Sequence, residues 1–238
     1  MTLKTLPLPL KVLATCFLFT VGTGYLVALA YLYLVDLEPH VKHGLGVVQA
    51  VIAKYHGNRQ GSRLEAVLAG GMGEMVTLEE NQQIIRWLRQ GAHEAEFVSI
   101  QPILKRACTV CHSPELRRPT TPPLTSYAEV SKYTVVDAGE SIKGLTGSSH
   151  VHLFGMSLIF MFTGAIFALS ETPQIFRLVV VAVPFLAIWF DIGSWWFTKY
   201  EPLFAYTVII GAVLMGISLA MQMGISIYEM WFVPSSQE

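Results

Sequence analysis

Residues 145–170 read LTGSSHVHLFGMSLIFMFTGAIFALS, and this stretch, which decides the fold, contains no Asp, Glu, Lys or Arg. A helix needs about 20 mainly apolar residues to cross the hydrocarbon core of a bilayer. Residues 12–35 and 203–228 meet the same requirement, and residues 178–197 are interrupted only by Asp191. An ionisable group near one end of a span can reach the interface or a buried partner. The sequence therefore predicts four transmembrane helices.

The composition agrees with a membrane protein. The chain has 238 residues, of which 53% are hydrophobic and 14% charged, and its mean hydropathy is +0.49, which is too apolar for an ordinary soluble domain. Sixteen basic against 17 acidic residues give no reason to expect nucleic acid as a partner. We expect an all-α fold in three parts: an N-terminal transmembrane anchor (1–36), a small helical domain (37–149) and a three-helix transmembrane bundle (150–238).

The positive charges predict the orientation. Lys4 and Lys11 precede the first span, and Arg177 lies in the loop between the second and third spans. The positive-inside rule then places both chain ends in the cytoplasm and residues 37–149 outside. The first apolar stretch is too long for the apolar region of a secretory signal and no A-x-A site follows it, so we expect it to stay as an anchor.

Residues 37–149 are predicted to be mainly helical. Thr77 and Glu80 form a capping box, which begins a helix that ends at Gly91. The other helices expected from apolar periodicity are His40 to Tyr55, a short one at residues 63–68 and one that starts at Ile100.

The most informative motif is Cys108-Thr109-Val110-Cys111-His112. CxxCH is the spacing at which two cysteines form thioethers to one haem while the next histidine ligates its iron. Zinc would need two more ligands, and no second CxxC is present. A thioredoxin-like dithiol would need a βαβ context, whereas residues 103–107 are typical of a helix. The third cysteine, Cys16, lies in the first span, so no disulfide framework is expected.

A family resemblance rests on this motif and its surroundings. Residues 100–104 (IQPIL), the CxxCH motif and Ser113-Pro114 resemble the haem-binding segment of monohaem c-type cytochrome domains, including those fused to bacterial membrane proteins. Residues 85–92 (IRWLRQGA) resemble the helix that often precedes it. The resemblance implies one covalent haem c on Cys108 and Cys111 with His112 as proximal ligand. It also implies a bacterial inner membrane, with the haem domain in the periplasm.

The sixth ligand of the iron departs from the family pattern. These domains usually supply a methionine downstream, but every methionine after His112 lies in a predicted span. We favour His152, with His150 as its neighbour; positions i and i+2 of a helix point to different faces, so at most one of them should meet a given iron. The remaining candidates are His40, His43, His56, His93, Met72 and Met75. For His56 we expect local hydrogen bonds in a turn.

The histidines expected at the external face of the inner membrane suggest a second cofactor site. His40, His43, His150 and His152 are expected near one level, where they could hold a haem b or a metal, or form a quinone site with Asp191 or Glu201. The alternative is that these helix ends are simply polar. Trp189, Trp195 and Trp196 are predicted to anchor the third span at the interface. For Asp191 we expect a hydrogen bond within the bundle or with a partner subunit, and the alternative is a carboxylate of a proton pathway.

The sequence contains no phosphate loop, nucleophile triad or dinucleotide fingerprint, so we expect no catalytic residues. The leading hypothesis is an electron-transfer subunit of a respiratory or photosynthetic membrane oxidoreductase complex. Its partners would be other redox subunits of the membrane and a soluble or membrane electron carrier. Two alternatives are a quinol-oxidising cytochrome with a quinol site in the bundle and a haem-based redox sensor.

Overall fold

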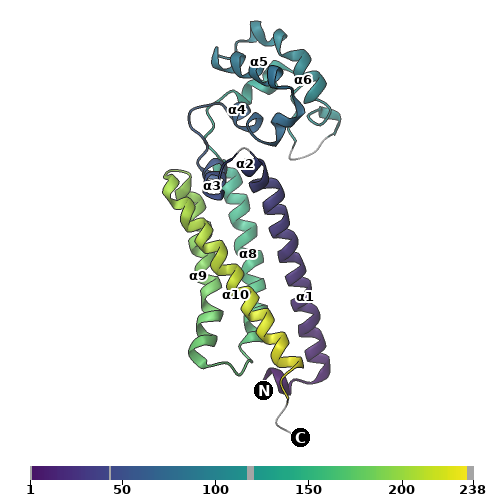
Figure 1. Cartoon of the computed structure of the whole chain (residues 1–238), viewed down its shortest axis with the longest axis vertical. Helices are drawn as coiled ribbons and strands as arrows, with labels where there is room; N and C mark the ends of the chain where they lie inside the picture. Colours follow the sequence, from purple (N-terminus) through teal and green to yellow (C-terminus); the bar gives the residue numbers. More distant parts are fainter. Residues whose placement is uncertain (1, 43, 117–120, 235–238) are drawn as a thin grey trace.

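The computed structural model describes residues 2–42, 44–116 and 121–234, and its regular elements are all helical. Four helices in this part of the chain are long and apolar enough to cross a membrane, which confirms the predicted all-helical, four-span architecture. They lie side by side as a bundle (Figure 1). Their bounds are Leu8–Tyr31 (α1), Ile142–Phe167 (α8), Gln174–Thr198 (α9) and Ala205–Trp231 (α10).

The first span is packed differently from the other three. A π-helical turn, Leu32–Leu37 (η2), and a short helix, Glu38–Lys42 (α2), continue α1 beyond the predicted limit at residue 36. Only 6% of the most apolar 18-residue stretch of this long helix is buried, against 22% for α8 and 33% for α9 and for α10. The helices α8, α9 and α10 therefore form the compact part of the bundle, and α1 leaves most of its apolar surface uncovered by this chain.

A buried polar contact joins the three compact helices. Pro184 lies inside α9 and has no N–H, so the carbonyl oxygen four residues earlier, at Val180, lacks its helical partner. Gln222 of α10 supplies a substitute, because its Nε2 donates to Val180 O at 2.9 Å. Thr163 of α8 donates in turn to Gln222 Oε1 at 2.5 Å. Both side chains are fully buried.

Replacing this amide should weaken the bundle. Gln222→Leu leaves the Val180 carbonyl without a donor in an apolar interior, and we expect a loss of about 1–3 kcal/mol. Unfolding of the purified protein in mixed micelles of rising sodium dodecyl sulfate content measures it. Ser226→Ala is the matched control on the same helix, since the Ser226 hydroxyl is buried and has no hydrogen-bond partner among the described residues. A Gln222→Leu protein as stable as Ser226→Ala would contradict this account.

The residues between α2 and α8 fold into a small helical unit, which we call the head. In Figure 1 most of the head lies beyond the end of the bundle where α1 finishes and α8 begins, whereas α3 lies at that end itself. Its helices are Val47–Tyr55 (α3), Arg63–Leu68 (α4), Leu78–Arg89 (α5), Gln101–Ala107 (α6) and Tyr127–Val130 (α7), with 3-10 turns that include Gly71–Met75 (η3) and Glu94–Ser99 (η4). The head core contains Leu64, Leu68, Ile84, Trp87, Phe97, Ile100, Ile103, Leu104, Leu124 and Val130.

The local signals in the head are mostly confirmed. At the start of α5, Glu80 N–H donates to Thr77 Oγ1 at 3.3 Å and Thr77 N–H donates to Glu80 Oε2 at 2.9 Å, so the capping box forms as predicted. The single helix predicted from His40 to Tyr55 is wrong. The chain leaves helical geometry at Gly44, whose φ of +77° is in the left-handed region, and α3 restarts after Gly46.

An aromatic stack attaches the head to the bundle. Tyr55, the last residue of α3, is 8% exposed and belongs to the same apolar cluster as residues of α8, α9 and α10. Its ring stacks on the indole of Trp195 in α9, with ring centroids 5.6 Å apart and an interplanar angle of 14°. A side chain of the head is thus part of the core of the bundle.

Hydrogen bonds at the end of α9 complete the attachment. The backbone carbonyl of Lys199 accepts from Arg59 Nη2 at 2.7 Å and lies 3.1 Å from His56 Nδ1. The Lys199 ammonium donates to the carbonyl oxygens of Ala138 and Glu140 at 2.8 and 2.7 Å. The predicted local role of His56 is therefore wrong, since its partner is 143 residues away. These bonds connect the end of α9 to both chain segments at the base of the head.

Candidate functional site

The CxxCH motif forms a tight turn at the end of α6. Cys108 N–H donates to Leu104 O at 2.8 Å and ends the helix. Within the motif, His112 N–H and Cys111 N–H both donate to Cys108 O, at 2.8 and 3.1 Å. Cys108 is half-buried and packs on the head core, whereas Cys111 is exposed. The turn therefore holds the backbone of the three residues close together, with the Cys108 side chain on the core side and the Cys111 side chain toward solvent.

A backbone carbonyl orients the His112 ring. Its Nδ1 lies 2.7 Å from Pro122 O, and because a carbonyl oxygen can only accept, Nδ1 carries the proton. Nε2 is then left with its lone pair, which is the arrangement of a metal-ligating histidine. Leu124 N–H donates to His112 O at 2.9 Å, so the segment after Pro122 holds the motif at two points.

The Cys108 thiol differs from that of a reactive dithiol. Burial raises its pKa, and the nearby positive charge of Arg106 only partly opposes this effect. Redox-active CxxC pairs instead lower the pKa of their attacking cysteine. Two thiols on one turn, followed by an imidazole with a free Nε2, fit a haem held by two thioethers and one axial nitrogen.

A small cavity lies directly beside the motif. Its volume is about 260 Å³, and its lining includes Leu104, Thr109 and Leu124. Thr109 is the second residue of the motif, and Leu124 is the residue whose N–H binds His112 O. The side of the motif next to the head core is thus partly open.

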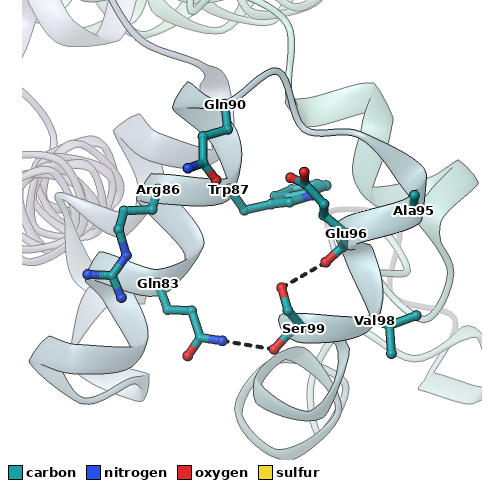
Figure 2. Close-up of a pocket in the computed structure, with 8 residues that line it drawn as sticks. All are labelled: Gln83, Arg86, Trp87, Gln90, Ala95, Glu96, Val98 and Ser99. Atoms are coloured by element: carbon teal, nitrogen blue, oxygen red, sulfur yellow. Dashed lines mark hydrogen bonds between the residues drawn. The ribbon is translucent and has the colours of Figure 1, made fainter.

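A larger groove was not predicted from the sequence. Figure 2 shows side chains of α5 and η4 around it, with Gln83 Nε2 donating to Ser99 O at 3.0 Å and Ser99 Oγ donating to Glu96 O at 2.7 Å. Its volume is about 530 Å³, and none of its lining residues belongs to the CxxCH motif. The polar residues of amphipathic α5 predicted only a solvent-exposed helix face, so the sequence did not indicate this groove.

The histidines predicted to approach the iron lie in the bundle. His152 Nδ1 is 2.8 Å from Ser148 O, and its ring forms a T-shaped contact with Trp195 at a centroid distance of 5.1 Å. The ring of His150 packs against Phe154 on the same helix, again at 5.1 Å. The structure therefore does not bring His150 or His152 together with His112, which lies in the head.

The remaining predicted ligands are also dispersed. His40 Nδ1 bonds to Asp36 O at 2.9 Å at the end of the first span near the head, His56 lies at the base of the head, and His93 is exposed between α5 and η4. His43 lies outside the described residues. Within the described part of the chain, no three His, Cys, Asp or Glu side chains form a group that could hold a metal ion.

Three polar side chains lie around the indole ring of Trp195. Its Nε1 donates to the buried carboxylate of Asp191 at 3.2 Å, which gives Asp191 the predicted hydrogen bond within the bundle. Tyr55 and His152 contact the same indole from the head and from α8. Trp195 is only 7% exposed, so its predicted role at the lipid interface is wrong, whereas Trp189 is 69% exposed and free to meet lipid.

The environment of Tyr55 is acidic as well as apolar. Burial, followed by the negative charges of Asp191, Asp36 and Glu140, raises the pKa of its hydroxyl far above the ordinary value. Ionisation of the Tyr55 hydroxyl is therefore strongly disfavoured between the head and the bundle.

In the comparison with known proteins, the similarity that was found lies in the membrane part of the chain. A family model described as a transmembrane helical domain matches residues 130–237, which contain α8, α9 and α10. No curated protein matches the chain. No solved structure matches it either.

Proposed function

We propose that the head is a c-type haem domain and that the protein is a membrane-bound electron-transfer subunit. The observation that carries the proposal is the hydrogen bond between His112 Nδ1 and Pro122 O, on a histidine that completes a CxxCH motif. It fixes the tautomer with Nε2 free for iron. Cys108 and Cys111 would hold the ring covalently, as the resemblance to c-type cytochromes implies. A bound haem would accept and release one electron at a time.

The proposed location is the outer face of a bacterial energy-transducing inner membrane. The start of α1 and the end of α10 lie at the end of the bundle opposite the head (Figure 1). Basic residues gather at that end: Lys4 pairs with Glu171 at 2.5 Å, and Lys11 Nζ donates to Met230 O at 2.8 Å. The positive-inside rule supports a cytoplasmic position for both termini and a periplasmic head.

The bundle would set the position of the haem relative to its redox partners. Electron tunnelling falls steeply with distance, so a carrier held at a fixed height above the membrane exchanges faster with a fixed partner than one on a flexible tether. The Tyr55 stack and the Lys199 hydrogen bonds supply such a fixed attachment. We propose other redox subunits of the membrane and a soluble or membrane carrier as the partners.

Spectroscopy and electron exchange test this function. The full-length protein, produced in bacterial membranes with c-type haem maturation, should carry one haem that stays attached on a denaturing gel. The reduced form should pass its electron rapidly to a soluble cytochrome c in stopped-flow experiments. A chain without covalent haem, or a haem that exchanges no faster than free haem peptide, would overturn the proposal.

A quinol-oxidising cytochrome is the second candidate, and one observation favours it. Trp195 gathers Asp191 and His152, the acid and the histidine expected to line such a site, at the end of the bundle near the head. A quinol analogue should then reduce the haem, and Asp191→Asn and His152→Ala should slow this step without changing exchange with soluble cytochrome. Binding of carbon monoxide by the reduced wild-type protein would instead favour a haem-based sensor with an open sixth position.

A further inference from the structure

We infer that the base of the head binds the phosphate of an anionic phospholipid through a basic cluster made of Arg59, Arg63 and Lys199. The lipid would belong to the leaflet on the head side of the membrane. This inference goes beyond the proposed electron transfer and does not depend on a haem.

Two members of the basic cluster are in direct contact. Arg59 Nη2 donates to Lys199 O at 2.7 Å, and Arg59 Nε donates to His56 O at 2.9 Å. The Lys199 ammonium donates to the carbonyl oxygens of Ala138 and Glu140 at 2.8 and 2.7 Å. All four acceptors are neutral backbone oxygens. These hydrogen bonds therefore position the two side chains without neutralising their charges.

The nearby carboxylates are engaged elsewhere. Asp137 is buried, and its two oxygens accept from the backbone N–H groups of Asn58 and Gly139, each at 3.0 Å. Glu140 Oε1 accepts from Ser141 N–H at 2.9 Å. Among the residues that the structure describes, no member of the basic cluster forms an ion pair with an acidic side chain. The cluster therefore keeps its charge for an anion from outside the chain.

The charges of the cluster also repel one another. Burial lowers the pKa of the Lys199 ammonium, and the positive charges of Arg59 and Arg63 act in the same direction. The negative charges of Glu140 and Asp137 oppose this effect without reversing it. A bound anion would relieve the repulsion, because an opposite charge nearby favours the protonated form of a lysine.

The two contacting side chains have further donors to offer. A guanidinium carries more N–H donors than the pair that Arg59 uses, and an ammonium carries one more than the pair that Lys199 uses. Hydrogen bonds from such charged donors to phosphate oxygens are short and strong, and an arginine can bind a phosphate at two points. Phosphate is thus the anion that this pair suits.

The basic cluster lies at the level of lipid headgroups. Lys199 follows Thr198, the last residue of α9, and the loop between α9 and α10 lies at the end of the bundle near the head (Figure 1). The 25 residues of α9 extend over about 38 Å. The hydrocarbon core of a bilayer is only about 30 Å thick, so the ends of α9 reach the headgroup layer.

Exposed apolar side chains next to Lys199 favour a lipid over a free phosphate ion. Phe197 is 58% exposed, Tyr200 70% and Leu203 69%. Aromatic side chains in such positions are typical of the membrane interface. A phospholipid brings acyl chains to these side chains and a phosphate to the basic cluster, whereas a free phosphate ion would meet only the cluster.

Lipid binding to the full-length protein in an uncharged detergent tests the inference. Native mass spectrometry should detect a retained phosphatidylglycerol, and phosphatidylcholine, which has no net charge, should bind more weakly. Arg59→Gln combined with Lys199→Gln should weaken phosphatidylglycerol binding about fivefold for each positive charge removed.

Arg63→Gln keeps the test decisive if the double variant does not fold. The hydrogen bonds described between head and bundle do not involve the Arg63 side chain. This variant should therefore be as stable as the wild type in detergent without lipid, and still bind phosphatidylglycerol about fivefold more weakly. Arg86→Gln is the matched control, because it removes the same charge from α5, away from the bundle (Figure 1), and should bind the lipid like the wild type.

Several results would overturn the inference. Equal binding of phosphatidylglycerol and phosphatidylcholine by the wild type is one, and wild-type binding of phosphatidylglycerol by Arg63→Gln is another. Inorganic phosphate that displaces phosphatidylglycerol at equal concentration would assign the site to the free ion and overturn the lipid. None of these results bears on covalent haem, so the proposed function would stand.

Discussion

Cys108→Ser combined with Cys111→Ser should abolish covalent haem completely. Both thioethers require these sulfur atoms, and the only other cysteine, Cys16, lies in α1. Haem staining of membranes on a denaturing gel should therefore show a band for the wild type and none for the double variant. Each single variant retains one possible thioether and should stain weakly.

Cys16→Ser is the matched control, since it removes a thiol of the same chain and should leave the stain unchanged. Immunodetection of the full-length chain in the same membranes shows whether the double variant still inserts. The four spans do not include Cys108 or Cys111, so insertion should persist. Equal staining of the double variant and the wild type would exclude attachment through this motif.

Tyr55→Ala should loosen the head from the bundle and lower the stability of the whole protein. The substitution removes an aromatic ring that is 8% exposed and leaves the face of Trp195 uncovered. Deleting a buried aromatic side chain costs about 3–5 kcal/mol. We expect a loss near the lower limit, because Tyr55 lies at the edge of the bundle. Denaturation in mixed micelles measures the stability, and limited proteolysis around residues 56–61 reports the loosening.

Tyr55→Phe separates packing from hydrogen bonding. It keeps the ring and the stack and removes only the hydroxyl, for which no partner is found among the described residues, so its stability should stay within about 0.5 kcal/mol of the wild type. Tyr200→Ala removes a tyrosine that is 70% exposed and should also be nearly neutral. If all three variants unfold at the same detergent composition, the stack does not hold the head.

The spans could be predicted from sequence because the bilayer imposes a length and a polarity that a single segment must satisfy by itself. The stretch from Leu145 to Ser170 matches α8 to within three residues at each end. The capping box at Thr77 and Glu80 was equally predictable, since both of its hydrogen bonds lie within one turn.

The positions of the candidate ligands could not be predicted, because they depend on contacts between distant segments. The sequence predicted His152 at the external surface of the membrane. In the folded bundle, its ring packs against Trp195. The orientation of His112 depends on Pro122, whose approach no local pattern predicts. The sequence predicted Trp195 at the lipid interface. Its burial was not predictable, because it requires Tyr55 from a helix some 140 residues earlier.

The loose packing of α1 has a consequence for how such a chain can be assembled. The three helices α8, α9 and α10 bury their polar groups against one another, and the matched family region covers these helices without α1. A membrane unit that is complete by itself does not depend on what is joined to its amino-terminal side. The buried contacts among these three helices would therefore persist if the head or the first span were exchanged for another segment.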